Sequence, residues 1–141
     1  MTLALDTSGL VKRYRREGGT DEVLVAMDRD PQWVVSAIAR TEAELALCVG
    51  LTPADRAGAV ERLRADLDRC LVVPVDPECL ARAADIGCEH GVRTLDALHL
   101  AAADRLPRPV TFLTFDRRQA AAARRLGLAV AGIDEDPTGD A

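Results

Sequence analysis

Four acidic residues could do chemistry together in this chain. Each lies at or near the end of an apolar segment, although they are far apart in the sequence: Asp6, Glu42, Asp96 and Asp116. A carboxylate beside a buried segment is costly unless a cation or several hydrogen-bond donors meet it. Four such carboxylates predict one acidic pocket that the fold assembles. The expected occupant is a hard divalent cation, Mg²⁺ or Mn²⁺, because such ions prefer oxygen ligands.

Each acid also has a simpler structural explanation. Asp116 can cap the helix that follows it, and Asp96 lies in the first turn of a helix, where the helix dipole favours an acid. Asp6 is harder to explain as a cap, because its neighbours Thr7 and Ser8 are good capping residues themselves. Separate explanations would be needed for all four acids, so a shared site is the more economical hypothesis.

His99 follows Asp96 by three residues, so their side chains share one helix face. We expect it to be packed and hydrogen-bonded near the acidic site; a role as metal ligand or proton shuttle is the alternative. The two histidines form no Ser-His-Asp or Cys-His pattern, and Gly18-Gly19 lacks the lysine of a phosphate-binding loop. Nucleophilic catalysis and nucleotide binding of those kinds are therefore not expected.

Basic residues follow two of the acids closely. The cluster after Asp6 and the pair after Asp116 are Lys12, Arg13, Arg15, Arg16, Arg117 and Arg118. Phosphate contacts need cations, so these residues are candidate nucleic-acid contacts in a chain whose net charge is −5. Solvated helix faces are the alternative for any one of them.

Short apolar segments alternate with helical patterns along the chain. The apolar segments are residues 3–5, 33–35, 70–75, 111–114 and 128–131. Strands that are short, apolar on both faces and separated by helices favour an α/β fold, with a central parallel sheet of about five strands flanked by helices. Sites in such sheets lie at the carboxyl ends of the strands, where Asp6 and Asp116 fall.

Polar residues before the helical patterns predict where the helices begin. Three helices are expected to be capped by hydroxyl residues: Thr7 or Ser8, Ser36, and Thr94. Thr52 followed by Pro53 is a strong start signal, and Asp76 opens the next helix by the same logic. The helix after residue 36 is expected to carry near one face Ile38, Glu42, Leu45 and Val49.

Length and composition predict one domain, residues 1–133, with a polar tail at 134–141. Apolar residues make up 48% of the 141 residues but aromatic ones only 3%, so aliphatic side chains must build the core. No run approaches the roughly 18 apolar residues of a membrane span, and no secretory signal is recognisable. Buried, reduced thiols are expected for Cys48, Cys70, Cys79 and Cys88. These features predict a cytoplasmic protein.

The chain resembles PIN-domain ribonucleases, specifically the VapC toxins of bacterial toxin–antitoxin pairs. The matching segments occur in the order typical of the family: LDTSGLVK (5–12), SAIARTE (36–42), TLDALHLAAA (94–103) and FLTFD (112–116). The resemblance covers residues 1–133. It implies a PIN-like three-layer α/β/α fold, Mg²⁺- or Mn²⁺-dependent endonuclease activity on RNA, and a cognate antitoxin.

The resemblance also assigns roles to residues. By position, the acidic quartet of the family falls on Asp6, Glu42, Asp96 and Asp116, and its hydroxyl positions fall on Thr7, Ser8 and Thr114. Asp6 is expected to be the central metal ligand, completed by Asp96 and Asp116. Glu42 is expected either to bind metal directly or to position the attacking water. Metal ions in such sites activate water and relieve charge on the leaving oxygen.

Partners and competing functions follow from the same comparison. The resemblance implies a homodimer that binds a small antitoxin, and candidate contacts are Leu10, Val11, Tyr14, Val23, Leu24 and Met27. A non-catalytic interaction module, whose acids receive a basic segment of another protein, is the alternative. A phosphatase with a DxD motif is disfavoured because Ser8 stands where its second Asp would be needed.

Overall fold

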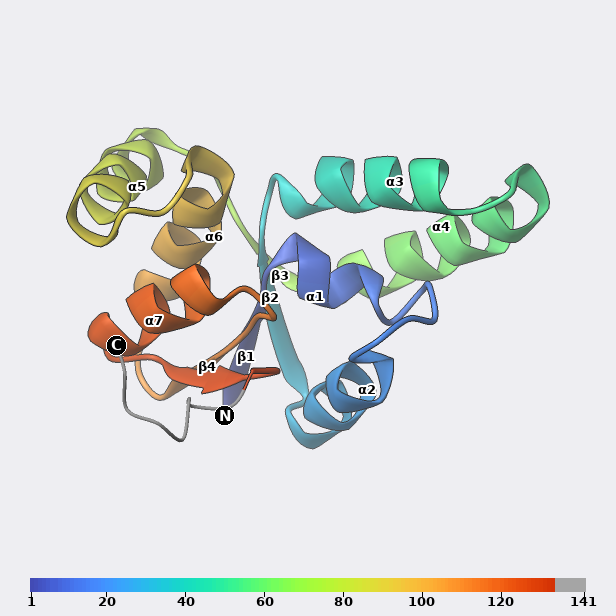
Figure 1. Cartoon of the computed structure of the whole chain (residues 1–141), viewed down its shortest axis with the longest axis horizontal. Helices are drawn as coiled ribbons and strands as arrows, with labels where there is room; N and C mark the ends of the chain where they lie inside the picture. The colour runs from blue at the N-terminus through green and yellow to red at the C-terminus, as the bar shows by residue number, and fades with distance from the viewer. Residues whose placement is uncertain (134–141) are drawn as a thin grey trace.

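A five-stranded parallel sheet forms the centre of the molecule in the computed structural model (Figure 1). The structure describes residues 1–133, so the predicted tail at 134–141 lies outside the described residues. The strands lie in the order β3-β2-β1-β4-β5. Their bounds are β1 Thr2–Leu5, β2 Gln32–Ser36, β3 Leu71–Val73, β4 Val110–Leu113 and β5 Ala129–Ala131.

The central strand β1 is buried on both faces, as its apolar sequence predicts. Leu3 and Leu5 point into one core cluster, whereas Ala4, between them, points into the cluster on the opposite face. Strand β1 pairs in parallel with β2 on one side and with β4 on the other, and Leu5 aligns with both Val35 and Leu113. The carboxyl ends of these three strands therefore meet at one edge of the sheet.

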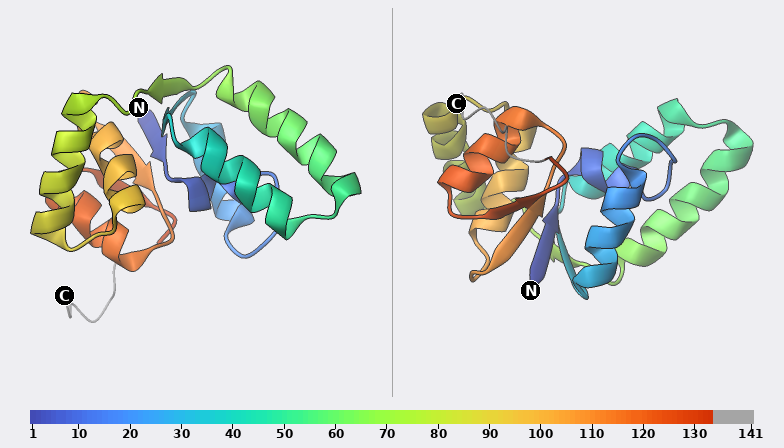
Figure 2. Two further views of the ribbon diagram at one scale, coloured as in Figure 1. Left: turned by 90° about the horizontal axis from the view of Figure 1, so that it is seen from above. Right: turned by 60° about the horizontal axis from the view of Figure 1, so that its bottom comes forward.

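Helices cover both faces of the sheet, which confirms the predicted α/β/α fold (Figures 1 and 2). One layer contains α1 Thr7–Val11, α2 Thr20–Arg29, α3 Ala39–Gly50 and α4 Pro53–Leu67. The other contains α5 Pro77–His90, α6 Thr94–Asp104 and α7 Arg117–Arg125. Helices α3 and α4 form an antiparallel pair that extends away from the sheet.

Three predicted helix caps were wrong. Asp6, rather than Thr7 or Ser8, caps α1, because its Oδ1 accepts a hydrogen bond from the N–H of Gly9 at 2.6 Å. The capping position of α3 is Ile38 rather than Ser36, and that of α6 is Arg93 rather than Thr94. Thr52, Asp76 and Asp116 are caps as predicted. Thr7, Ser8 and Thr94 lie inside the first turns, and Ser36 ends β2; a hydroxyl residue close to a helix start resembles a cap in the sequence alone.

The first helix is short. It ends at Val11, and the chain then continues in turns toward Arg15. In these turns the N–H groups of Lys12, Arg13 and Tyr14 donate to carbonyls three residues earlier rather than four. This tightening turns the basic segment away from a straight continuation of α1.

The predicted inner face of α3 was wrong as well. Leu45 and Val49 are 60% and 87% exposed, and the buried side chains of the helix are Ala39, Ala43 and Leu47. Helix α3 lies between α1 and α4, and small alanines let helices approach closely. The sequence pattern is compatible with two apolar faces of α3. The face with the smaller side chains is the one that is buried.

The proposed antitoxin-contact residues belong to the core instead. Leu10, Val11, Tyr14, Val23 and Met27 are all buried, and they join one hydrophobic cluster with strand residues of the sheet. Only Leu24 of that set is partly exposed, at 36%. A partner therefore cannot use this set as its contact surface, and that prediction was wrong.

Three of the four predictions of buried cysteines were wrong, and Cys70 is only partly buried. All four cysteines are free thiols, but only Cys79 is buried, whereas Cys48 and Cys88 are exposed.

Within residues 1–133, no helix has the length and hydropathy that crossing a bilayer requires.

Candidate active site

The acids reach one end of the sheet because of the strands and helices that carry them. Asp6 follows β1 directly, and its N–H donates to the carbonyl of Leu113, the last residue of β4, at 3.3 Å. Asp116 begins α7 just beyond β4. Glu42 and Asp96 lie in the first turns of α3 and α6. Residues separated by 110 positions in sequence thus meet at the carboxyl edge of the sheet.

Three of the four acids line one pocket of about 310 Å³. The residues around it are Asp6, Thr7, Ser8, Val11, Arg15, Glu42, Ala46, Asp96 and His99. Asp116 is not among them, but it lies close enough to Asp96 for its charge to raise the pKa of that carboxyl. The predicted quartet is therefore gathered at one place, with Asp116 at its margin.

The carboxylate of Asp6 is almost completely buried and is held by three donors. It accepts hydrogen bonds from the N–H of Gly9 at 2.6 Å, from the hydroxyl of Ser8 at 2.8 Å and from that of Thr114 at 3.1 Å. Burial nevertheless raises the pKa of Asp6 above its usual value, because the lost hydration outweighs these donors. A cation beside Asp6 would restore the charged form.

Gly9 makes the short contact with Asp6 possible. A Cβ atom at this position would lie 2.9 Å from Oδ1 of Asp6 and 3.0 Å from a methyl carbon of Leu113. Real Cβ atoms essentially never approach so closely, so another side chain would move the carboxylate.

Glu42 is paired with His99 and Thr7. Its Oε1 lies 2.7 Å from Nε2 of His99 and 2.9 Å from the hydroxyl of Thr7, which donates to it. The hydrogen bond from His99 is the main cause that lowers the pKa of Glu42. His99 is buried and hydrogen-bonded, as expected, although among residues 1–133 its Nδ1 atom has no hydrogen-bond partner. These two hydrogen bonds therefore favour the ionised form of Glu42.

The negative charge of Asp116 acts on the carboxyl of Asp96. Burial raises the pKa of Asp96 first, and the negative charge of Asp116 raises it further. Asp116 accepts a hydrogen bond from the N–H of Gln119 at 2.8 Å and so caps α7. Its capping role and a role at the site are compatible, since a carboxylate has a second oxygen.

The donor set fits a hard cation chemically. Its side chains are carboxylates and hydroxyls, and Mg²⁺ needs few protein oxygens because it keeps several waters. Among residues 1–133, no three Asp, Glu, His or Cys side chains lie in an arrangement that would hold an ion. Two effects act on the acids when no cation is present. The carboxylates repel one another, and the carboxylate of Asp6 is hydrogen-bonded to Gly9, Ser8 and Thr114 instead.

Side chains of the first basic cluster form ion pairs with acids of the same chain. Lys12 pairs with Glu17 at 3.1 Å and lies over the ring of Phe115. Arg13 pairs with Asp66 of α4 at 2.9 Å and lies over the ring of Trp33. Arg13 is thus engaged with α4 and is not among the residues that line the acidic pocket.

The remaining basic residues differ in what they contact. Arg15 lines the acidic pocket, although it also pairs with Glu17. Arg16 forms an exposed pair with Asp21. In the described part of the chain, the exposed side chains of Arg117 and Arg118 have no hydrogen bond or ion pair. Both follow Asp116 directly and remain available for an anionic ligand.

Sequence reasoning missed two residues near the acids. Gln119 is fully buried, and its amide lies between Thr114 and the backbone of Asp96. The signal was present, because Gln three residues after a capping Asp resembles a capping box. Arg93 is the other residue, since its charge lowers the pKa of Asp96.

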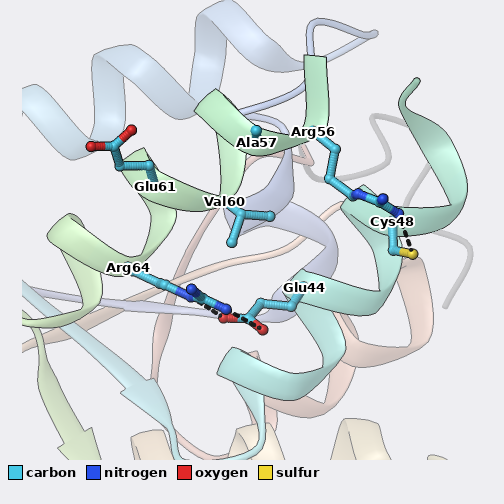
Figure 3. A pocket seen from close by; sticks show the side chains of 7 residues that line it. All are labelled: Glu44, Cys48, Arg56, Ala57, Val60, Glu61 and Arg64. Carbon is cyan, nitrogen blue, oxygen red and sulfur yellow. Dashed lines mark hydrogen bonds and ion pairs between the residues drawn. The ribbon is translucent and has the colours of Figure 1, made fainter. Parts of the chain in front are cut away.

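A larger hollow of about 550 Å³ lies between α3 and α4 and has a different character (Figure 3). Arg64 and Glu44 face each other across it at 2.8 Å, and Arg56 donates to the sulfur of Cys48. The pKa of Glu44 is lowered by Arg64, so this hollow contains a neutralised ion pair. Two carboxylates line it, Glu44 and Glu61, and the first is paired, whereas three line the smaller pocket, so size alone does not identify the site.

Comparisons with known proteins agree on one family. The family model described as "PIN domain" matches residues 3–125. Ribonuclease VapC46 of Mycobacterium tuberculosis (strain ATCC 25618 / H37Rv) is 38% identical over 127 residues, 89% of this chain and 93% of that protein. Ribonuclease VapC47 of M. tuberculosis (strain CDC 1551 / Oshkosh) is 30% identical over 128 residues, 90% of this chain and 93% of that protein.

A solved structure supports the same fold. A toxin–antitoxin complex from Klebsiella pneumoniae contains a chain that superimposes with a TM-score of 0.69, at 20% identity. The match covers 92% of this chain and 96% of that one. The sheet and its flanking helices are therefore shared over nearly the whole chain.

Proposed function

The chain belongs to the PIN domain family as a VapC-type ribonuclease, and we propose that it hydrolyses RNA with Mg²⁺ or Mn²⁺ held by its acids. The observation that carries this proposal is the convergence of Asp6, Glu42 and Asp96 in one pocket, with Asp116 beside it. Raised pKa values of Asp6 and Asp96 support it, because a bound cation would favour the ionised forms that burial disfavours.

The acids would divide the work between them. Asp6, Asp96 and Asp116 would hold the cation, which supplies an activated water and relieves charge on the leaving oxygen. Glu42 remains ionised because His99 and Thr7 hydrogen-bond to it, and it would orient the attacking water by accepting a hydrogen bond from it. Ser8 and Thr114 hold the Asp6 carboxylate in place through their hydroxyls.

The RNA backbone would reach the acids along the first turn of α7. Arg117 and Arg118 are exposed there and have no ion-pair partner among residues 1–133, and Arg15 lines the pocket from the opposite layer. Phosphate contacts at these cations would offset the net charge of −5. Lys12 and Arg16 would contribute less, because each pairs with an acid and neither lines the pocket.

We also propose that the protein acts as the toxin of a pair, as a homodimer bound by a small antitoxin in the cytoplasm. The structural neighbour from K. pneumoniae is described as a toxin–antitoxin complex, and the two curated relatives are named as ribonucleases. An unrestrained ribonuclease would harm the cell that makes it, so an inhibitory partner is required.

Expression in a host that lacks the neighbouring antitoxin gene tests this role. The wild-type protein should arrest growth, and Asp6→Asn, made in equal amount by immunoblot, should not. Supplying the antitoxin gene should restore growth. Equal growth of cells that make either protein would contradict a toxin function.

A further inference from the structure

Gln119 connects three of the elements around the acidic site. Its Oε1 atom lies 2.7 Å from the hydroxyl of Thr114, just beyond β4. Its amide nitrogen donates to the backbone carbonyl of Asp96, in α6, at 3.4 Å. Its own N–H donates to the carboxylate of Asp116 at 2.8 Å, and its side chain is fully buried in α7. The residue thus contacts the backbone of one acid and the side chain of another.

Thr114 extends this network to a third acid. Its hydroxyl lies 3.1 Å from Oδ2 of Asp6 and accepts a hydrogen bond from the N–H of Asp116 at 3.1 Å. A hydroxyl carries one hydrogen, so Asp6 and Gln119 are two acceptors for the same donor. The position of the Gln119 amide therefore influences how Thr114 meets Asp6.

We propose that Gln119 is a positioning residue that fixes the relative places of Asp6, Asp96 and Asp116 for the cation. This inference rests on the proposed metal-dependent function. The three acids come from separate elements, and like charges push those elements apart. A buried amide that joins α6, α7 and the end of β4 opposes that separation.

Packing alone does not account for an amide at this position. The other buried side chains of α7 are alanines: Ala120, Ala122 and Ala123. A buried amide costs free energy unless it is hydrogen-bonded, and an apolar residue of similar size would avoid that cost. Hydrogen bonds also have direction, which apolar contacts lack, and groups that orient metal ligands influence metal affinity.

The test compares Mn²⁺ affinity with stability in two variants. Gln119→Met keeps the length and removes both hydrogen-bonding groups, whereas Leu63→Ala removes a fully buried side chain of α4 that does not line the acidic pocket. Mn²⁺ binding is measured by electron paramagnetic resonance, and Tm is measured in EDTA. Gln119→Met should weaken Mn²⁺ binding by about tenfold, as is typical of residues that orient ligands. Leu63→Ala should lower Tm and leave the Mn²⁺ affinity unchanged.

A second variant keeps the test decisive if Gln119→Met does not fold. Gln119→Asn retains the amide but is one methylene shorter, so neither contact is reached, and it should weaken Mn²⁺ binding similarly. Wild-type affinity in a folded variant would overturn the positioning role. Absence of Mn²⁺ binding by the wild type would instead overturn the proposed metal site, so the two failures are distinguishable.

A double-mutant cycle tests whether the network acts as a unit. Thr114→Val removes the hydroxyl and keeps the shape, and it should weaken Mn²⁺ binding by itself. In the double variant with Gln119→Met, the loss of Mn²⁺ affinity should not exceed the larger of the two single losses, because the effects of contacting residues are not additive. Additive losses would show that Gln119 does not act through Thr114 and would overturn the network.

Discussion

Nε2 of His99 lies 2.7 Å from Oε1 of Glu42, and the hydroxyl of Thr7 lies 3.1 Å from the same ring nitrogen. The pair joins α6 to α3 across the acidic pocket, although the two residues are 57 positions apart in sequence. The hydrogen bond favours the charged form of Glu42. Because the ring nitrogen is buried and the carboxylate borders the pocket, the contact fixes the carboxylate that we assign to the attacking water.

Replacing His99 should change the titration of Glu42 in the metal-free protein. The pKa of Glu42 is lowered in the folded state, so this group stabilises the fold above its unfolded pKa, and the contribution is lost as pH falls through the folded pKa. His99→Leu should raise the pKa of Glu42, measured by carboxyl-carbon NMR. His90→Leu changes the other histidine and should leave it unaltered. An unchanged Glu42 titration in His99→Leu would contradict the role of His99.

Neutralising Asp6 should stabilise the metal-free protein at pH 7. Burial raises the pKa of Asp6, so its favourable contribution is complete below the unfolded pKa and is lost as pH rises through the folded pKa. Asp6→Asn should gain about 1 kcal/mol in the free energy of unfolding, or about 4 °C in Tm. Thermal unfolding in EDTA measures it. The gain should vanish at pH values below the ordinary pKa of Asp, about 3.9, and a loss of stability at pH 7 would refute this account.

Gly9→Ala should disturb the site without removing any functional group. The added Cβ would lie 2.9 Å from Oδ1 of Asp6, so the carboxylate must shift. Mn²⁺ affinity should fall by about tenfold, the size expected when a ligand is misoriented. Gly18→Ala is the matched control, because its Cβ would meet nothing within 4 Å. Equal Mn²⁺ affinity in both variants, measured by calorimetry, would show that the close contact is unimportant.

The RNA path can be tested by charge removal at opposite edges of the sheet. Arg117→Ala with Arg118→Ala should weaken RNA binding across sequences and leave Mn²⁺ affinity unchanged. The slope of log affinity against log salt should fall by about 1.4, two contacts at about 0.7 each for single strands. Fluorescence anisotropy over a salt series measures it.

A charge-matched control separates this path from a general charge effect. Arg29 and Arg69 are exposed and precede β2 and β3, at the amino edge of the sheet. Their double replacement by Ala removes the same charge and should leave the slope unaltered. Equal effects of the two double variants would place the RNA elsewhere.

The architecture could be predicted because its determinants are local. Short runs such as residues 3–5 and 33–35 are apolar at every position, and the helices between them exclude an antiparallel meander. The carboxyl edge of a parallel sheet then gives the place of Asp6 and Asp116. The strong start signal Thr52-Pro53 correctly predicted where α4 begins.

What could not be predicted depends on tertiary packing. Asp6 rather than Thr7 is the cap, because the turn brings its Oδ1 to the N–H of Gly9. Residue types alone do not reveal this contact. Leu45 is exposed although its pattern fits a buried face, because α1 and α4 contact the alanine face of α3. The position of Gln119 between three elements becomes visible only when α6 and α7 are placed together.

Cleavage of a labelled RNA by the purified protein tests the central claim most directly. The wild type should cut the RNA with added Mg²⁺ or Mn²⁺ and should stop in EDTA. Asp6→Asn, with its fold verified by circular dichroism, should give no cleavage at any metal concentration. Cleavage by folded Asp6→Asn at the wild-type rate, or undiminished wild-type cleavage in EDTA, would contradict metal-dependent hydrolysis at this acidic site.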